Sequence, residues 1–441
     1  MSTVEIPDAK LATVVRWDLG LDENEPILEN SLKELKELIA HNYYIRDLTG
    51  IEKMTGLTTL KLYANFNITD ITPLAGLTQL TELDLAMNKI TDITALAKLT
   101  QLTKLHLGGG GNKINDLTPL TGLTQLTDLS ISGDEIIDIT PLTGLTQLTD
   151  LSLSGSEIID ITPLAGLTQL TDLSISGSEI IDITPLAGLT QLTRLSLQRQ
   201  VVRDLTNLGT LLAGLPLLRS LNLYSSQLND ITPLTDLVRL TMLNLNDNEI
   251  QDITPLAGLT QLTELNLRGN QIQDITPLTG LTQLKELRLS CNQISDITPL
   301  AGLTHLTKLD LSDNEIQDIT PLAGLTQLEF LNLSHNHVQD ITPLMGLNQL
   351  KNLSLDHNQI NDVTCLTGLT QLTHLFLSGN EIGDVTSLAG LTELVSLNLS
   401  HNHIQDISFL KNLKHLRFLH ISPNPIQDLA PIRGLRVKVL H

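Results

Sequence analysis

The side chains in this sequence that could do chemistry are mostly carboxylates, and one of them recurs at a fixed spacing. An aspartate returns 18 times, and 14 of the 17 intervals between its copies are 22 residues long. A catalytic carboxylate is not needed 18 times, so we interpret this marker aspartate as a loop residue that accepts local hydrogen bonds. The copies are Asp47, Asp70, Asp92, Asp116, Asp138, Asp160, Asp182, Asp204, Asp230, Asp252, Asp274, Asp296, Asp318, Asp340, Asp362, Asp384, Asp406 and Asp428.

Other carboxylates form two columns in three consecutive copies. Neighbouring strands lie about 4.8 Å apart, and like charges at that distance repel, so these columns would favour cations or a basic partner. The alternative is duplication of a soluble repeat whose charges are screened by water. The strand column is Asp128, Asp150 and Asp172, and the column near the turn is Glu135, Glu157 and Glu179.

Aromatic and histidine side chains gather towards the C-terminus, where ten of the 12 histidines lie at or after His305. Exposed aromatics on a regular surface are typical of binding hot spots, and histidine would make binding depend on pH. The alternative for the histidines is that turns tolerate any polar residue. We expect Phe330, Phe376 and Phe418 at outward strand positions with His374 and His420, and His335, His357 and His401 near the turns.

Signatures of catalysis and metal binding are missing from the sequence. The histidines are spread over several strands without acidic or cysteine partners at ligand spacing. Cys291 and Cys365 cannot make a disulfide framework, and the run Gly108 to Gly111 lacks the lysine of a phosphate loop. We therefore expect no catalytic residue, no metal and no cofactor, and a protein that is not an enzyme.

The secondary-structure elements that position these residues can be predicted from one repeated sequence motif. In the copy LTELNLRGNQIQDITPLTGLT, Leu265 and Leu267 alternate with polar residues, which is the period of a strand. Thr276-Pro277 resembles a helix N-cap followed by proline at the first helical position. The segment after it has room for one short turn of helix, which we expect to be 3₁₀.

A single copy cannot bury its own leucines, so the copies must stack. The expected fold is of the α/β class: a right-handed, curved solenoid of about 18 repeats, with a parallel concave sheet and short 3₁₀ or helical turns on the convex side. Residues 1–31 break the pattern and predict an N-terminal helical cap, with Leu11, Val14, Val15 and Leu19 on one face. Residues 32–441 carry the repeats, which are irregular near 108–111 and 205–218.

An asparagine stands four positions before most of the marker aspartates. It is present at Asn88, at Asn112 and in nine consecutive copies from Asn248 to Asn424. Its amide can bond backbone groups and connect neighbouring repeats. Five copies in a row lack it, and we expect those copies to open first: they carry Asp134, Ser156, Ser178, Gln200 and Ser226 instead.

Charge and hydropathy limit the classes of partner and the cellular compartments that we expect for this protein. The net charge of −22 repels phosphate backbones and anionic membranes, so we expect no nucleic-acid partner. The sequence holds no stretch that reads as a membrane span and no signal peptide. We therefore expect a cytoplasmic protein, or a cell-surface or secreted one if the sequence is a piece of a longer chain.

The pattern LxxLxLxxNxIxDITPLxGLTxL resembles the 22-residue class of leucine-rich repeats over about residues 32–440. It is similar to the repeats of bacterial internalins, and also to those of the leucine-rich regulatory subunit of protein phosphatase 1. The DITPL motif is most similar to the repeats of the internalin-like group, in which N-terminal helical caps precede the repeats. The resemblance implies a concave surface that recognises another macromolecule.

The functional hypothesis is therefore a non-enzymatic scaffold that binds a protein partner on its concave face. The sequence names neither that partner nor the oligomeric state. We place the site on the C-terminal repeats from Phe330 to His420, with the acidic stretch from Asp128 to Glu179 as the alternative site. The alternative function is the recognition part of a larger protein, either a surface adhesin or a fusion of repeats with a GTPase.

Overall fold

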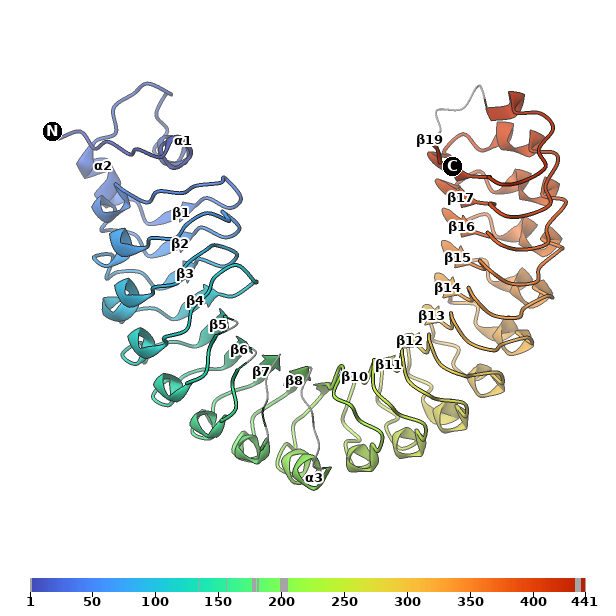
Figure 1. Ribbon diagram of the computed structural model, residues 1–441, viewed down its shortest axis with the longest axis horizontal. Coiled ribbons are helices and arrows are strands. Elements are labelled where there is room, and N and C mark those ends of the chain that lie inside the picture. The colour runs from blue at the N-terminus through green and yellow to red at the C-terminus, as the bar shows by residue number, and fades with distance from the viewer. Residues whose placement is uncertain are drawn as a thin grey trace. The chain divides into compact units, whose positions relative to one another are not determined.

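The computed structural model divides into two compact units, an N-terminal unit (Met1–Ser226) and a C-terminal unit (Gln227–His441). It describes residues 2–133, 135–155, 157–176, 180, 182–198, 205–432 and 438–440. In each unit the strands lie side by side on the concave side and the helical turns lie on the convex side (Figure 1). The expected solenoid with a parallel sheet is confirmed.

The strands of the N-terminal unit are parallel and follow one another in chain order, with the strand leucines in register, as in Leu83↔Leu105↔Leu129. Their bounds are β1 Glu37–Ile39, β2 Thr59–Lys61, β3 Glu82–Asp84, β4 Lys104–Leu107, β5 Asp128–Ser132, β6 Asp150–Ser154, β7 Asp172–Ser176, β8 Arg194–Gln198 and β9 Ser220–Asn222.

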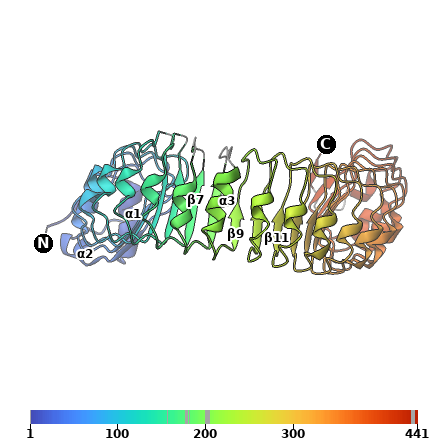
Figure 2. The ribbon, with the colours of Figure 1, turned by 90° about the horizontal axis from the view of Figure 1, so that it is seen from below.

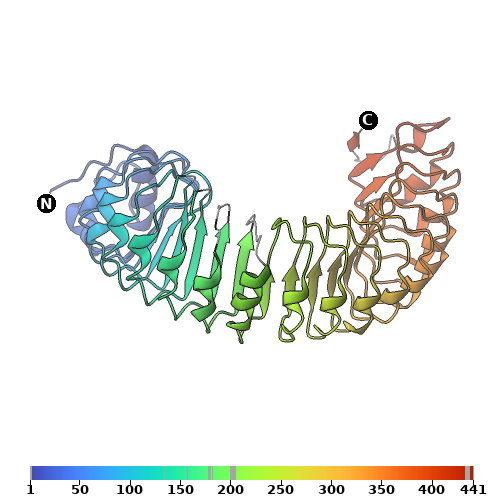
Figure 3. The same ribbon diagram turned by 60° about the horizontal axis from the view of Figure 1, so that its bottom comes forward.

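The strands of the C-terminal unit repeat this arrangement, and Figure 3 shows them as parallel arrows within the unit. The register again aligns the leucines, as in Leu265↔Leu287↔Leu309. Their bounds are β10 Met242–Asn244, β11 Glu264–Asn266, β12 Glu286–Arg288, β13 Lys308–Asp310, β14 Phe330–Asn332, β15 Asn352–Ser354, β16 His374–Phe376, β17 Ser396–Asn398, β18 Phe418–His420 and β19 Lys438–Leu440.

Short 3₁₀ turns return the chain on the convex side, as Figure 2 shows along each unit. The N-terminal unit has η1 Ile51–Lys53, η2 Thr72–Leu74, η3 Thr94–Lys98, η4 Thr118–Leu120, η5 Thr140–Leu142, η6 Thr162–Leu164 and η7 Thr184–Gly188. The C-terminal unit has η8 Thr232–Leu234, η9 Thr254–Leu256, η10 Thr276–Gly280, η11 Thr298–Leu300, η12 Thr320–Gly324, η13 Thr342–Gly346, η14 Thr364–Gly368, η15 Thr386–Gly390, η16 Ser408–Asn412 and η17 Ala430–Ile432.

The core is a set of leucine and isoleucine rows between the strands and the turns. In the copy that contains β11, Leu265, Leu267, Ile272, Ile275 and Leu278 are all at most 1% exposed. Burying one such side chain contributes about 1.5–3 kcal/mol. Because each copy repeats these positions, burial holds adjacent copies together and leaves the sheet's concave surface free to vary.

The marker aspartate caps the turn, and the expectation that Thr276 is the N-cap is wrong. Thr276 is the first residue of η10, and the N-cap position is Ile275, whose side chain makes no capping bond. The backbone N–H of Thr276 donates to Oδ1 of Asp274 at 2.8 Å. The interpretation of the marker as a loop hydrogen-bond acceptor is confirmed.

The repeated asparagine connects each turn to the turn of the preceding copy, as expected. The Nδ2 of Asn314 donates to the carbonyls of Leu311 (3.1 Å) and Leu289 (3.0 Å), and its Oδ1 accepts the N–H of Ile294 at 3.0 Å. Asn65 makes the same kind of bonds to Leu62, Ala40 and Ile45. Sequence reasoning missed it because one extra residue separates it from Asp70.

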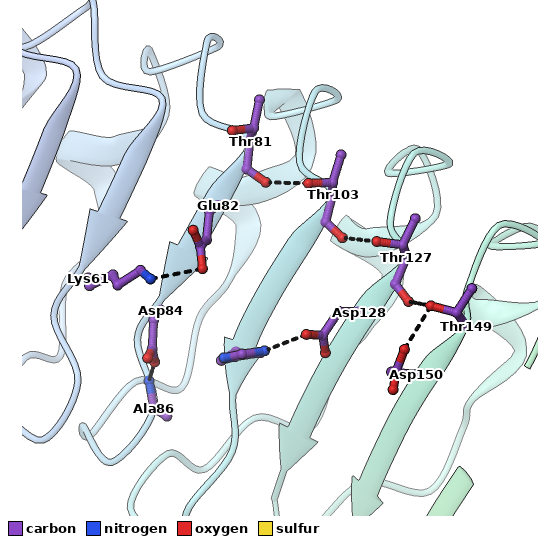
Figure 4. A network of polar contacts seen from close by, with 11 residues as sticks. Lys61, Thr81, Glu82, Asp84, Ala86, Thr103, Thr127, Asp128, Thr149 and Asp150 are labelled. Atoms are coloured by element: carbon purple, nitrogen blue, oxygen red, sulfur yellow. Dashed lines mark hydrogen bonds and ion pairs between the residues drawn. The ribbon is translucent and has the colours of Figure 1, made fainter. Parts of the chain in front are cut away.

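A second ladder of side-chain bonds precedes the strands of the N-terminal unit (Figure 4). The hydroxyl of Thr103 donates to the carbonyl of Thr81, that of Thr127 to Thr103, and that of Thr149 to Thr127, at 3.0–3.1 Å. The sequence analysis did not identify this role of threonine. Its signal was the threonine that stands directly before the strand in most copies.

The cap at the N-terminus contains α1 (Ala9–Asp18) and α2 (Glu29–Glu34). Leu11, Val14 and Val15 of α1 are buried, whereas Leu19 is its half-buried C-cap residue. Asp8 accepts the N–H groups of Lys10 and Leu11 and also those of Arg46 and Asp47. Burial opposes ionisation, yet these four bonds hold the pKa of Asp8 below its usual value. The helix is thereby tied to the first repeat. The expected boundary between residues 31 and 32 falls inside α2 and stays a prediction.

Both insertions leave the stack intact. In the insertion at residues 205–218, the segment Leu205–Ala213 forms α3, where other copies have a 3₁₀ turn (Figure 2). At the glycine-rich insertion, Gly109 and Gly110 adopt φ of 89° and 75°. Asn112 still reaches the carbonyls of Leu107 and Leu85. Extra residues are therefore absorbed at the turns.

Asn314→Ala tests the asparagine ladder. The change leaves buried carbonyls and one buried N–H without partners, so we expect the free energy of unfolding to fall by about 1–3 kcal/mol. Chemical denaturation measures it, and Gln317→Ala, an exposed residue three positions on, is the control. A loss no larger than that of the control would contradict the role assigned to the amide.

Acid should unfold the repeats through the marker aspartates. Hydrogen bonds from the hydroxyl and the N–H of Thr276 hold the pKa of Asp274 below its usual 3.8, and the same pair of bonds lowers it at Asp252, Asp296 and Asp318. A lowered pKa in the folded state contributes stability above pH 3.8 that is lost as pH falls through the folded pKa.

We expect Asp→Asn at these four positions to lower stability at pH 7 and to flatten its decline below about pH 4, because the amide does not titrate. Urea denaturation at pH 7, 5 and 3 measures both. The control replaces four exposed carboxylates elsewhere in the C-terminal unit: Asp236→Asn, Glu249→Gln, Glu315→Gln and Glu381→Gln. Identical pH profiles for the two variants would refute the prediction.

The copies without asparagine give a prediction for hydrogen exchange. Of their five substitutes, Asp134, Ser156, Ser178 and Gln200 lie outside the described residues. The hydroxyl of Ser226 donates to the carbonyls of Leu197 and Tyr224, at 3.3 and 3.4 Å. Strands β5–β8 extend over five residues, so their backbone ladder is longer. We still expect their amides to exchange before those of β11–β16, because a repeat stack opens locally. Equal protection in both stretches would count against it.

Candidate functional site

Two positions in each strand face the concave side, one on either side of the buried strand leucine. We call the residue before that leucine the first column and the residue after it the second column. In the C-terminal unit the register aligns Phe330, Asn352, His374, Ser396 and Phe418 in the first column. Variation at these positions does not disturb the core, so they are where binding chemistry can differ between copies.

The three expected phenylalanines all take concave positions. Phe330 and Phe418 lie in the first column and Phe376 lies in the second, aligned with Ser354 and Asn398. Phe418 is 44% exposed, and Phe330 and Phe376 are half-buried. Phe330 and Phe418 are four strands apart, about 19 Å at the usual strand spacing. The three rings follow one another along the sheet. In the strand register, each phenylalanine is paired with polar residues and not with another phenylalanine.

The two strand histidines accompany this line. The rings of His374 and Phe376 have centroids 6.4 Å apart on the same strand. His420 lies in the second column beside Asn398, and its Nδ1 is buried without a hydrogen-bond partner among the described residues.

The turn histidines lie just beyond the strands in the left-handed conformation, with φ of 54° at His335, His357 and His401. The rings of His335 and His357 stack, with centroids 4.4 Å apart. A Cβ at Gly379 would lie 2.6 Å from Nδ1 of His357, so the ring of His357 covers that glycine. The stack therefore stops there and does not reach His401.

Asp356 is a site residue that the sequence analysis missed. Burial raises the pKa of its carboxyl, although the N–H of Ser378, at 2.6 Å from Oδ1, and the nearby His357 and His335 oppose the rise. The carboxyl thus lies near enough to the stacked histidines for their charge to act on it. Its position in the sequence, next to His357, was the available signal.

The expected acidic column exists, but basic groups partly neutralise it; Figure 4 shows Asp128 and Asp150 of this column. Asp128, Asp150 and Asp172 are register partners in β5, β6 and β7. Nε2 of His106 lies 3.2 Å from Oδ2 of Asp128, and Arg194 forms an ion pair with Asp172. Oδ2 of Asp150 lies 2.8 Å from the hydroxyl of its neighbour Thr149, which shares its one proton between this carboxylate and the carbonyl of Thr127. Exposed ion pairs of this kind contribute at most about 1 kcal/mol, yet they reduce the field that would attract a basic partner.

The second acidic column is only partly described. Glu135 and Glu157 are exposed near the turns, and Glu179 lies outside the described residues. Without the third member, the structure gives no geometry for this column as a whole.

A cluster of aromatics in the first repeats was also missed. Four of the ten aromatic residues of the chain lie between Tyr43 and Phe66. Tyr44 is 59% exposed and Tyr63 and Phe66 are each 40% exposed. The ring of Tyr44 lies 6.3 Å from that of Phe66 and the ring of Tyr63 lies 6.0 Å from His41. Tyr44 and Phe66 both have φ of 61°, which is uncommon for bulky residues.

Metal-binding clusters and membrane-spanning helices are absent from the described residues. No group of three or more histidine, cysteine, aspartate or glutamate side chains there is arranged to hold a metal ion. Within the same part of the chain, no helix has the length and apolar character needed to cross a bilayer.

Comparison with known proteins agrees with the repeat pattern. A family model described as leucine-rich repeats in two copies matches residues 55–98, 78–122, 238–280, 260–302, 348–390 and 392–434, and a second leucine-rich-repeat model matches 282–338. A search of curated proteins finds no match.

Solved structures illustrate the likeness. The internalin inlF of Listeria monocytogenes is 31% identical, with 94% of this chain and 95% of that chain covered and a TM-score of 0.41. A leucine-rich-repeat protein of Leptospira interrogans is 21% identical, with 94% and 97% covered and a TM-score of 0.61. The plant peptide hormone receptor RGFR1, solved in complex with RGF2, is 22% identical, with 93% and 74% covered and a TM-score of 0.61. The functional domain of InlJ from Listeria monocytogenes is 26% identical, with 94% of this chain and 79% of that chain covered and a TM-score of 0.50. On the family matches, the chain belongs to the leucine-rich-repeat proteins, and on this likeness it is internalin-like.

Proposed function

We propose that this chain is a non-enzymatic scaffold that binds a protein partner on the concave face of its C-terminal unit, between Phe330 and His420. The observation that carries the proposal is the exposure of phenylalanine at positions that have no part in the core. Phe418 is 44% exposed on β18, and most neighbouring positions hold serine or asparagine. Burying one such ring in an interface could contribute about 1.5–3 kcal/mol.

The proposal fits what is known of the fold. The matched families are repeat families and indicate no enzyme. The plant receptor was solved with the peptide RGF2 bound. Similarity in fold does not transfer a partner, so the location between Phe330 and His420 rests on this chain's own side chains.

The acidic column from Asp128 to Asp172 is the alternative site on the N-terminal unit. It would prefer a basic partner and lose affinity steeply with added salt. Its ion pairs with His106 and Arg194 make it the weaker candidate. The alternative function, the recognition part of a larger adhesin or GTPase fusion, uses the same surfaces and is tested by the full reading frame.

Paired variants decide between the two sites. The partner is first captured with the intact chain and identified by mass spectrometry, and its Kd is then measured. We expect Phe376→Ala with Phe418→Ala to raise Kd by at least about tenfold per ring, and Asp150→Asn with Asp172→Asn to leave it nearly unchanged.

The matched control is Ser354→Ala with Asn398→Ala, which trims the register neighbours of Phe376 and leaves the rings in place. Circular dichroism checks that each variant is folded. If the aromatic variant binds like the parent, the C-terminal site is wrong. If only the acidic variant loses binding, the partner binds the N-terminal unit.

A further inference from the structure

The concave face of the C-terminal unit is hollowed where β10 to β14 lie side by side. The hollow has a volume of about 470 Å³ and Phe330 forms part of its wall. Arg268, Arg288 and Lys308 also line it, so cationic groups from three successive copies converge beside the first phenylalanine of the proposed site.

The cations in this hollow are only partly neutralised. Glu286 forms ion pairs with both Arg288 and Lys308, the latter at 3.2 Å. Asp310 accepts the N–H and the hydroxyl of Ser312. The nearby Cys291, and after it the carboxylates of Asp247 and Asp310, raise the pKa of Arg268 above its usual value. None of the ion pairs found among the described residues includes Arg268. Three positive and two negative side chains leave a net charge of +1, in a chain of net charge −22.

Asn246 adds a polar side chain to the wall of the hollow. Its Nδ2 donates to Oδ2 of Asp247 at 3.2 Å, and its Oδ1 is buried below the surface.

We propose that this hollow binds an acidic peptide segment of the protein partner. Arg268 and Arg288 receive the carboxylate of an aspartate or glutamate side chain, because the guanidinium fork matches the two carboxylate oxygens. An apolar side chain next to that carboxylate in the segment packs on Phe330. This inference rests on the proposed function and adds the charge of the partner at one end of the site.

The probe for the test is a set of blocked dipeptide amides: N-acetyl-Phe-Glu-amide, N-acetyl-Phe-Gln-amide and N-acetyl-Phe-phosphoserine-amide. Saturation-transfer NMR on the full chain measures the affinity of each. We expect the glutamate probe to bind at least about fivefold more tightly than the glutamine probe and to lose that preference in high salt, because the contact is exposed.

Variants assign the preference to the hollow. Arg268→Gln with Arg288→Gln should abolish it, whereas Arg239→Gln with Lys411→Gln, exposed cations elsewhere in the same unit, should preserve it. Glu286→Gln should strengthen binding of the glutamate probe several-fold, because it removes the internal competitor for Arg288 and Lys308. A misfolded variant would not produce such a gain.

Three outcomes would overturn the inference: equal binding of the glutamate and glutamine probes, an unchanged preference in the double arginine variant, or tighter binding of the phosphoserine probe. The experiments distinguish failure of this inference from failure of the proposed function. If the aromatic variants weaken partner binding but the probes show no preference for glutamate, only the present inference fails. If the probes behave as expected but Phe376→Ala with Phe418→Ala binds the partner normally, the proposed location fails.

Discussion

The side-chain amide of the repeated asparagine joins each turn to the turn before it, and the rest of the stack depends on that bond pattern. One group, as at Asn314, satisfies carbonyls of its own and the preceding copy and an N–H of the preceding copy. These backbone groups are buried, where an unpaired polar group costs about 1–3 kcal/mol. The tight turn that ends each strand is therefore stable only when the neighbouring copy is present. This requirement explains why extra residues enter at the turns while the leucine rows continue without interruption.

A stack held in this way separates stability from recognition. The leucines and the asparagine face inward. The marker aspartate accepts a hydrogen bond that stabilises the start of the 3₁₀ turn, as Asp274 does from the N–H of Thr276. The two concave positions of each strand take no part in packing the core or in hydrogen bonding the turns. Differences between otherwise similar copies therefore concentrate there, from the aspartates of β5–β7 to the cations of β12–β13 and the phenylalanines of β14–β18.

The concave faces of the two units differ in chemistry. In the N-terminal unit, carboxylates are matched with His106, Lys61 and Arg194, so much of the charge is satisfied within the chain. In the C-terminal unit, the exposed ring of Phe418 and the half-buried rings of Phe330 and Phe376 lie on the same face as a hollow. The cations that line this hollow outnumber its anions. Unsatisfied groups of this kind are what a partner can use, and they favour the C-terminal unit as the binding surface.

The sequence by itself determined the repeat, the alternation of the strands, the short turns and the columns to which Phe330, Phe376 and Phe418 belong. These features follow from local periodicity, and stacking identical copies fixes the register. Only the tertiary structure decided how side chains from different copies meet. It showed Arg194 against Asp172, the ring stack of His335 on His357, the convergence of Arg268, Arg288 and Lys308, and the place of Asn65 in the ladder. Each depends on a contact between residues about 20 positions apart and on side-chain directions, which a repeat pattern does not encode.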